Sequence, residues 1–190
     1  MIDGDSTATE CTNCGLSRGR HRIVNGCGPK DAKVLFVGEA PGAKEDDTGT
    51  PFVGRSGRFL DSVLAELGVD RGEVFITNIV RCRPPGNRKP SKSEIDSCQE
   101  NLLRELKAVR PKVVVALGAT AINFLTGNSG KLDTMIGKEM KVDFAGINLT
   151  VVPCYHPSAA MRNRQMKSAF EKAVSKALSI SKRMSQGAPR

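Results

Sequence analysis

Two polar stretches carry the side chains with the clearest capacity for chemistry. The first runs from Gly38 to Gly57 and holds a carboxylate, Glu39, and one aromatic ring, Phe52, among several glycines. Glycine lets the backbone approach a flat ligand closely because no Cβ intervenes. A ring, a carboxylate and a close backbone together predict a site for a planar heterocycle rather than a cradle for a phosphate.

The second stretch contains His156, one of only two histidines in the chain, followed by Pro-Ser. Asn78 ends a different apolar run and offers both a donor and an acceptor, which matches the acceptor–donor edge of a pyrimidine. The structural alternatives are a core histidine and a turn-forming asparagine. Both residues follow apolar runs typical of strands, and this position favours a role in the crevice at the carboxyl ends of a sheet.

Six cysteines form the third feature, and four of them fall into a C-x2-C pair, Cys11 and Cys14, and a C-x15-C pair, Cys82 and Cys98. In an intracellular chain such pairs indicate a metal or a cluster before disulfides. Four thiolates suit zinc or an iron–sulfur cluster, and the loose second pair favours [4Fe-4S]. Separately buried thiols are the remaining alternative. Cys27 and Cys154 are left over, and packing is the expected role of Cys154.

The elements that must position these residues alternate between short apolar runs and helical periodicity, which predicts crossover units. We expect an α/β fold: a single three-layer αβα domain over residues 1–190 with a mainly parallel four-stranded sheet, residues 1–30 forming an N-terminal cluster-binding segment. The predicted strands are Val34–Val37, Val74–Val80, Val113–Leu117 and Leu149–Val152, with an antiparallel hairpin near Met140–Phe144.

Four helices are predicted between and after these strands. One covers Gly57 to Leu67, and one opens at Ser91 with a capping box to Glu94 and stops before Pro111. Another begins near Ala119. The last runs from Arg164 toward Lys182, with residues 184–190 frayed.

The formal net charge of +9 predicts a polyanionic partner, the alternative being cations that merely solvate the surface. No apolar run approaches the length of a membrane span, and the polar N-terminus is unlike a signal peptide. These observations predict a cytoplasmic protein without a membrane partner.

Four motifs, in order, resemble those of the family 4 uracil-DNA glycosylases, the iron–sulfur-containing branch of that superfamily. They are Gly-Glu-Ala-Pro-Gly, Pro-Phe-Val-Gly-Arg-Ser-Gly, Thr-Asn-Ile-Val-Arg-Cys-Arg-Pro-Pro-Gly-Asn-Arg and His-Pro-Ser-Ala-Ala-Met-Arg. The resemblance implies a monomeric enzyme that hydrolyses the N-glycosidic bond of uracil in DNA and leaves an abasic site, in base excision repair. It also implies a [4Fe-4S] cluster on Cys11, Cys14, Cys82 and Cys98.

The same resemblance implies roles in the uracil site. Phe52 would stack on uracil, Asn78 would read its edge, and His156 would donate to O2 and so stabilise the leaving anion. Backbone amides of Glu39 and Ala40 would add to this stabilisation.

The group that activates water is less directly implied, because the best-known uracil glycosylases carry a carboxylate where this chain has Ala40. We favour Glu39, with Glu45 as the second candidate. The alternative for Glu45 is a solvated acidic loop, Glu45 to Asp47.

Contacts to DNA are expected from two segments. Met161 would wedge into the gap left by the flipped nucleotide, its alternative role being a core methionine. Cations that flank Cys82 or follow His156 would contact phosphates: Arg81, Arg83, Arg88, Lys89, Lys92, Arg162 and Lys167.

Three rival functions follow from the same residues. One branch of the superfamily traps uracil-DNA covalently through a histidine in the loop after the second strand, but Pro84 to Pro90 contains none. A non-enzymatic iron–sulfur module that only binds nucleic acid is the second rival. The convergence of Glu39, Asn78 and His156 argues against it. A zinc-stapled nucleotide hydrolase lacks a metal-binding carboxylate or histidine motif.

Overall fold

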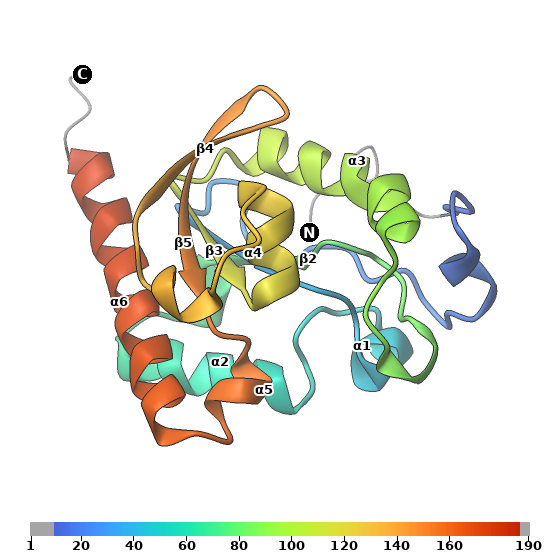
Figure 1. Cartoon of the computed structure of the whole chain (residues 1–190), viewed down its shortest axis with the longest axis horizontal. Coiled ribbons are helices and arrows are strands. Elements are labelled where there is room, and N and C mark those ends of the chain that lie inside the picture. The colour runs from blue at the N-terminus through green and yellow to red at the C-terminus, as the bar shows by residue number, and fades with distance from the viewer. Residues whose placement is uncertain (1–9, 187–190) are drawn as a thin grey trace.

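The computed structural model describes residues 10–186 of the 190-residue chain. At its centre lies a five-stranded sheet in the order β2-β1-β3-β5-β4 (Figure 1). The first four strands in this order run parallel, and β4 pairs antiparallel with β5 at the edge. The predicted α/β class with a mainly parallel sheet is confirmed. The strands are β1 (Val34–Gly38), β2 (Phe75–Asn78), β3 (Val113–Leu117), β4 (Met140–Phe144) and β5 (Ile147–Cys154).

The predicted number of four strands was wrong, because the hairpin expected near Met140–Phe144 contributes β4 to the same sheet. Ala145 and Gly146 join β4 to β5 with φ values of 50° and 79°. Positive φ at both central residues is what a tight two-residue hairpin turn needs. Burial alternates along β4, so only one of its faces packs on the core and the strand carries no continuous apolar run.

Helices cover both faces of the sheet and complete the three layers (Figure 1). On one face lie α3 (Lys92–Val109) and α4 (Ala119–Thr126), which pack through residues such as Leu102, Leu106 and Ile122. On the other lie α2 (Arg55–Glu66) and α6 (Arg164–Gln186), which pack through residues such as Leu60, Phe170 and Val174. Each large apolar side chain buried in this way contributes about 1.5–3 kcal/mol, so the two cores hold the sheet firmly.

Helix boundaries follow their capping chemistry. The expected capping box of α3 is confirmed: the Ser91 hydroxyl accepts from the Glu94 amide, and the Glu94 carboxylate accepts from the Ser91 amide at 2.7 Å. α6 continues to Gln186, beyond the predicted end at Lys182. Met184 is helical and packs against the core, so its predicted fraying was wrong; residues 187–190 lie outside the described part.

The shorter elements are α1 (Ala43–Thr48), α5 (Pro157–Ala160) and the 3-10 turns η1 (Gly15–Arg18), η2 (Arg71–Glu73), η3 (Pro85–Asn87) and η4 (Leu132–Thr134). The acidic stretch Glu45 to Asp47, for which a solvated loop was the alternative prediction, forms α1 instead. Asp46 in it is only 1% exposed, so the stretch is not simply solvated.

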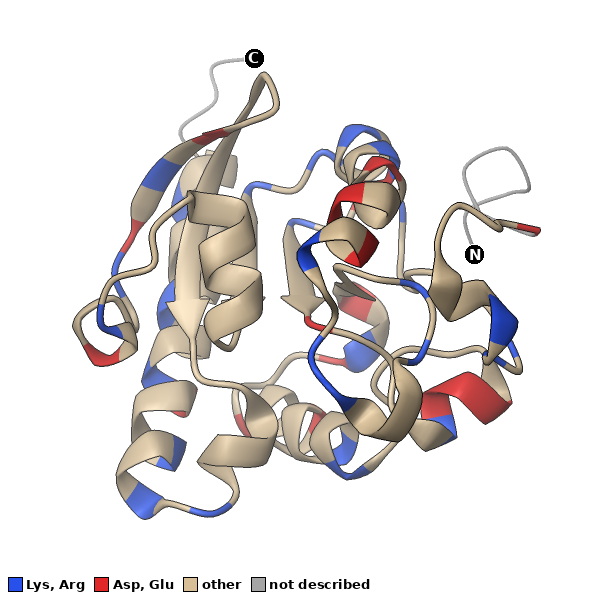
Figure 2. Cartoon of the chain, turned by 45° about the vertical axis from the view of Figure 1, so that its right-hand side comes forward, with Lys and Arg blue, Asp and Glu red and all other residues tan. Residues whose placement is uncertain are grey.

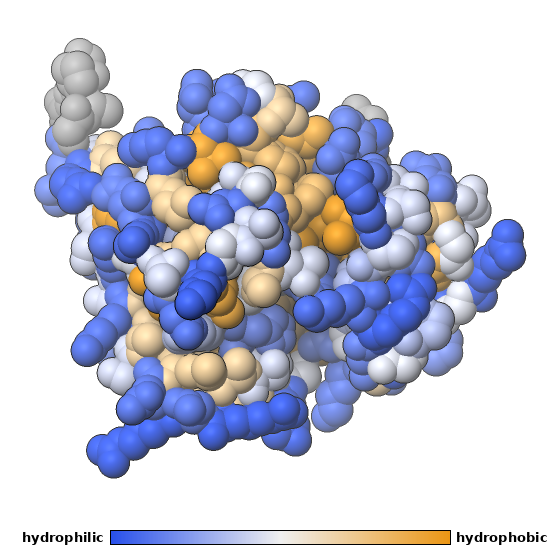
Figure 3. Space-filling view, viewed as in Figure 1, coloured by the Kyte–Doolittle hydropathy of each residue, from blue (hydrophilic) through white to orange (hydrophobic). Residues whose placement is uncertain are grey.

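The surface in the view of Figure 3 is largely hydrophilic, with apolar patches around α4. Across residues 10–186, none of the helices combines the length and the apolar character that crossing a membrane requires.

Parallel strands bring four chain segments to one edge of the sheet. Gly38 at the end of β1 pairs with Asn78 at the end of β2, and Leu117 at the end of β3 pairs with Cys154 at the end of β5. The residues at or just beyond these positions, including Glu39 and His156, therefore meet at the carboxyl edge, where open α/β sheets place their ligands.

Candidate functional site

A cleft of about 500 Å³ opens at the carboxyl edge of the sheet. Its walls come from the loops after β1, β2 and β5 and from the start of α2. The structure brings together in this cleft most of the residues that the sequence singled out: Glu39, Ala40, Glu45, Phe52, Asn78, Arg88, His156 and Arg162. Arg83 and Met161 are not among its lining residues.

Phe52 forms one wall of the cleft and has an unusual backbone. Its φ is 54°, in the left-handed region that residues other than glycine seldom adopt. Phe52 is 6% exposed, and the centroid of its ring lies 6.3 Å from that of the His156 ring, with the planes inclined at 37°. A Cβ at position 38 would come within 2.5 Å of Phe52 Cζ, so the ring can lie over the end of β1 only because Gly38 has no side chain.

Asn78 lies beside the same glycine and is 1% exposed. Its backbone carbonyl accepts from Arg81 Nη1, but Oδ1 of its side chain is buried without a hydrogen-bond partner among the described residues. A buried, unpaired polar atom costs about 1–3 kcal/mol, and such atoms are rare in native proteins. The amide is therefore placed to receive a hydrogen bond from a ligand.

His156 caps the N-terminus of α5, and this contact fixes its tautomer. Nδ1 accepts the Ser158 backbone N–H at 3.2 Å and lies 2.7 Å from Ser158 Oγ. Because the backbone N–H can only donate, the proton of the neutral ring is on Nε2. Burial lowers the pKa of His156 below its usual range, and the nearby Glu39 carboxylate acts in the opposite direction. The ring is therefore a neutral N–H donor at physiological pH.

Glu39 and Glu45, the two candidates for activating water, differ in the hydrogen bonds that their carboxylates already accept. Glu39 accepts a short hydrogen bond from Thr120 Oγ1 in the first turn of α4. Glu45 uses both oxygens on backbone amides: Oε2 accepts from Gly42 at 3.1 Å and Oε1 from Gly54 at 2.7 Å. These amides belong to the N-caps of α1 and α2, so Glu45 ties the two helix starts together at the cleft.

Basic segments surround this edge of the molecule. Figure 2 shows Lys and Arg along the loop after β2 and at the start of α6, whereas α1 is acidic. Arg88 makes a bidentate pair with Glu94, at 2.7 and 2.8 Å, which lowers the pKa of Glu94 to about 2. Arg83 donates to Asn87 Oδ1 at 2.8 Å, while Arg162 is exposed at the cleft and Met161 is half-buried just after α5.

The prediction that Arg81 contacts phosphate was wrong. Its side chain is 2% exposed and forms an internal ion pair with Glu105, with 2.7 Å between Nη2 and Oε2. Glu105 in turn accepts the Gly26 amide at 2.8 Å. Arg81 therefore braces the end of β2 from inside the protein and is shielded from any polyanion.

The four paired cysteines, Cys11, Cys14, Cys82 and Cys98, border one small cavity between the N-terminal segment and α3. Burial raises the pKa of Cys82, and the neighbouring Cys98 and Cys14 thiols raise it further. Arg20, which donates to the Cys82 sulfur at 3.4 Å, acts in the opposite direction and lowers this pKa. Cys27 is exposed and Cys154 is buried elsewhere, as its expected packing role requires.

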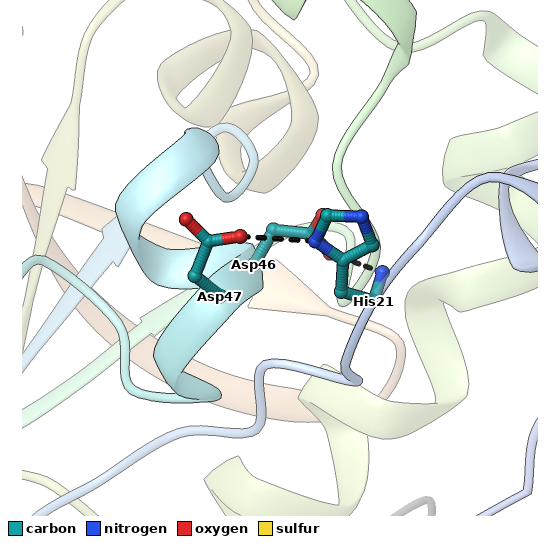
Figure 4. Close-up of side chains that lie close together, drawn as sticks. All are labelled: His21, Asp46 and Asp47. Carbon is teal, nitrogen blue, oxygen red and sulfur yellow. Dashed lines mark hydrogen bonds and ion pairs between the residues drawn. The ribbon is translucent and has the colours of Figure 1, made fainter.

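The N-terminal segment is also tied to α1. His21 Nδ1 lies 2.9 Å from Asp47 Oδ1 and 3.6 Å from Asp46 Oδ2 (Figure 4). Asp46 additionally accepts the backbone amide of His21 at 3.0 Å. Because α1 also carries Glu45, these contacts connect the cysteine-bearing segment to the wall of the cleft.

Several residues of the site gave no signal that we recognised in the sequence. Thr120 follows the end of β3, and the carboxyl-edge rule that drew attention to His156 applies equally to it. Glu105 is an acid on the buried face of α3, a recognisable break in the apolar pattern. Arg71, which contacts the Phe52 backbone, has no local pattern that would mark it.

Comparison with known proteins agrees with this geometry. A model of the uracil DNA glycosylase superfamily matches residues 26–179, so the chain belongs to that superfamily. It is 39% identical over 165 residues to the type-4 uracil-DNA glycosylase of Archaeoglobus fulgidus, covering 85% of this chain and 83% of that protein. For the type-4 enzyme of Thermotoga maritima the identity is 43% over 155 residues, covering 82% and 80%.

A type-5 uracil-DNA glycosylase of Pyrobaculum aerophilum is also similar, at 36% over 152 residues, but the match covers 72% of this chain and 66% of that protein. Within the superfamily the chain belongs to the type-4 family, as the sequence motifs predicted.

Proposed function

We propose that this protein hydrolyses the N-glycosidic bond of uracil in DNA, releases the base and leaves an abasic site for base excision repair. The observation that carries the proposal is the unpaired, buried Oδ1 of Asn78 beside the Phe52 ring and the His156 donor. An acceptor without a partner calls for a donor. Uracil supplies one at N3–H, whereas N3 of cytosine is itself an acceptor.

Hydrolysis builds negative charge on the uracil that leaves and positive character on the sugar. His156 Nε2–H would donate to uracil O2 as that charge develops, and a neutral donor suffices because the accepting oxygen becomes anionic. Glu39 and Ala40 line the same cleft, and their backbone amides would contribute further donors. Stacking on Phe52 would hold the flipped base in place at about 1–3 kcal/mol.

Glu39 is our candidate for orienting the attacking water. Its contact with Thr120 fixes one carboxylate oxygen and so sets the direction of the group. Glu45 is a weaker candidate, because both of its oxygens already accept from backbone amides. We assign Glu45 instead to holding the shape of the loop between β1 and α2.

DNA would lie across the basic edge of the sheet. Extruding a nucleotide from the stack costs a few kcal/mol, which an apolar wedge and phosphate contacts can offset. Met161 is the wedge that we propose, because it is partly exposed at the turn after α5. Arg83, Arg88 and Arg162 are the proposed phosphate contacts. We further propose that the protein acts in the cytoplasm and as a monomer.

Cys11, Cys14, Cys82 and Cys98 would hold a [4Fe-4S] cluster. Their sulfurs receive hydrogen bonds typical of cluster thiolates: Arg20 to Cys82, and the Arg81 amide to Cys98 at 3.3 Å. Across residues 10–186, no three of these sulfurs lie within 4.8 Å of one another. One zinc ion at about 2.3 Å from each would need them about 3.8 Å apart, whereas a cube binds each thiolate on a separate iron. Held by these four cysteines, such a cluster would link the N-terminal segment, the loop after β2 and α3 covalently.

The decisive experiment uses a labelled oligonucleotide with a single uracil, incubated with the purified holoprotein and then treated with alkali. Strand scission at the uracil position is the expected result, and a matched thymine oligonucleotide should stay intact. His156→Ala, which removes the proposed donor, should be about 10²–10³-fold slower. An SDS-resistant adduct without scission would establish covalent trapping instead, and binding with neither product would establish a non-enzymatic module.

A further inference from the structure

Phe52 adopts its left-handed backbone only because contacts outside its own loop impose it. Left-handed φ is unfavourable for a residue with a bulky side chain and persists only where the surroundings determine it. Gly57 in α2 provides one such contact: a Cβ there would lie 1.6 Å from the Phe52 carbonyl oxygen. The start of α2 therefore packs directly on the Phe52 backbone, with no room for a side chain between them.

Arg71 provides the second contact. Its Nη2 donates to the Pro51 carbonyl at 2.6 Å and its Nη1 to the Phe52 carbonyl at 3.1 Å. These two carbonyls belong to the peptide planes on either side of the Phe52 Cα. The orientation of the first plane sets φ of Phe52 and that of the second sets ψ. One rigid guanidinium thus fixes both dihedrals, and with them the direction in which the ring leaves the backbone.

The arginine is itself held in place. Nη1 also lies 2.5 Å from Asp61 Oδ1 on α2. The backbone of Arg71 belongs to η2, where Asp70 and Glu73 form a capping box just before β2. Arg71 therefore connects three parts of the molecule: the base of β2, the middle of α2 and the turn that carries Phe52. The arginine side chain is 30% exposed and lies outside the cleft lining, so it does not itself contact a base.

We propose that Arg71 is a positioning residue that sets the Phe52 ring for stacking on the flipped base. The proposal rests on the proposed uracil-DNA glycosylase function and adds a residue to its recognition machinery. A lysine could not replace it fully, because an ammonium is a single point and cannot span two carbonyls with fixed geometry. Gly57 is the complementary requirement, since any side chain there would push the Phe52 carbonyl away from the guanidinium.

Single-turnover kinetics separate this role from a general structural one. Stacking holds the base both before and during bond cleavage, so its loss raises the half-saturating enzyme concentration and leaves the maximal rate nearly unchanged. Arg71→Met should raise that concentration about 10-fold, within the range expected for losing one base–aromatic stack. Arg71→Lys should fall between Arg71→Met and the native protein. Arg183→Met is the matched control, because Arg183 pairs with Glu139 at 3.0 Å away from the cleft, and it should change neither parameter.

A double-mutant cycle with Phe52→Ala tests whether Arg71 acts through the ring. Phe52→Ala alone should raise the half-saturating concentration, and adding Arg71→Met should then have less than about a 2-fold further effect. Equal effects of Arg71→Met in both backgrounds, or a lower maximal rate at constant half-saturation, would overturn the Arg71 proposal alone. If Phe52→Ala itself changed nothing, the stacking role of Phe52 would fail and the Arg71 proposal with it.

The chain has no tryptophan, so Phe52→Trp provides a single fluorophore at the position in question. In that background Arg71→Met should lower the fluorescence anisotropy and increase quenching by acrylamide, with Arg183→Met again unchanged. This measurement needs neither DNA nor turnover. An unaltered anisotropy in a folded Phe52→Trp/Arg71→Met protein would overturn the proposal regardless of the kinetics.

Discussion

Arg81 and Glu105 form an ion pair inside the protein, with 2.7 Å between Nη2 and Oε2 and side chains only 2% and 5% exposed. The pair connects the carbonyl of Asn78, through Arg81, to the amide of Gly26, through Glu105. The backbone amide of Arg81 also donates to Cys98. A single buried residue therefore links the Asn78 end of β2 to the cysteine-bearing part of the chain.

We expect Arg81→Met to destabilise the protein by about 3–5 kcal/mol, because it leaves the Glu105 carboxylate buried without its partner. The double variant Arg81→Met/Glu105→Gln should recover much of this loss, since no buried charge remains. Urea unfolding of the holoprotein measures both. If Arg81→Met were as stable as the double variant, the Glu105 carboxylate would not need Arg81 to compensate its buried charge.

The pH dependence of stability should reveal the neutral His156. Burial lowers its folded-state pKa below the ordinary value of 6.5, so between these two values the unfolded chain binds a proton that the folded protein does not. Stability due to this residue is therefore complete above about 6.5 and falls as the pH drops toward the folded pKa. His156→Asn, which cannot titrate, should lack this component, and parallel curves for the two proteins would contradict the assignment.

The sequence was sufficient to predict the parallel order of elements, because each buried strand is a short apolar run, and β1, β2 and β5 each have a polar residue at or just beyond the end. Glu39, Asn78 and His156 could be brought together by the carboxyl-edge rule alone, without any knowledge of distances. The fifth strand was missed as part of the sheet because Met140–Phe144 packs on one face only.

The roles of Arg81 and Glu45 could not be read from local sequence. Arg81 stands in a run of cations that looks like a phosphate-binding segment, and only its long-range partner Glu105, 24 positions away in the chain, explains why it is buried. Glu45 lies among acids typical of a solvated loop, yet its bonds to Gly42 and Gly54 place it between two helix starts. For Arg81 the deciding partner is distant in the chain, and a local pattern carries no information about it. For Glu45 the bond to Gly42 is a local capping contact, and the bond to Gly54, nine positions on, is the one that the acidic run did not indicate.

Cys82→Ser should abolish the proposed cluster. A serine hydroxyl is a poor ligand for iron, so the preparation should lose its brown colour together with its iron and acid-labile sulfide, and it should unfold at a lower temperature. Cys27→Ser is the matched control, because Cys27 is an exposed free cysteine, and it should retain all three properties. A colourless native protein that contains zinc would contradict the cluster assignment.

Arg162 and Arg88 should differ in their contribution to DNA binding. Arg88 already shares its charge with Glu94, whereas Arg162 has no ion pair among the described residues. Arg162→Gln should reduce the slope of log affinity against log salt by about 1, as expected for one lost phosphate contact. Arg88→Gln should change the slope less, because Glu94 competes with the phosphate. Fluorescence anisotropy titrations at several salt concentrations measure both slopes, and equal slopes would show that Arg88 leaves Glu94 on binding.

Glu39→Gln and Glu45→Gln should fail in different ways, although both replace a carboxylate in the same cleft. Glutamine at 39 can still accept from Thr120, so the position is kept while the charge is lost. The maximal single-turnover rate should fall by about 10²–10⁴-fold, typical of a lost general base, without a change in unfolding temperature.

Glutamine at 45 keeps one acceptor but turns an NH₂ group toward a backbone N–H of Gly42 or Gly54, so that two donors face each other. Losing this charge-assisted bond costs about 1.5–3 kcal/mol, and the unfolding temperature should fall accordingly. If Glu45→Gln instead lowered the maximal rate of a fully stable protein, Glu45 rather than Glu39 would be the residue that orients water, since bracing alone cannot slow the chemical step while leaving stability intact.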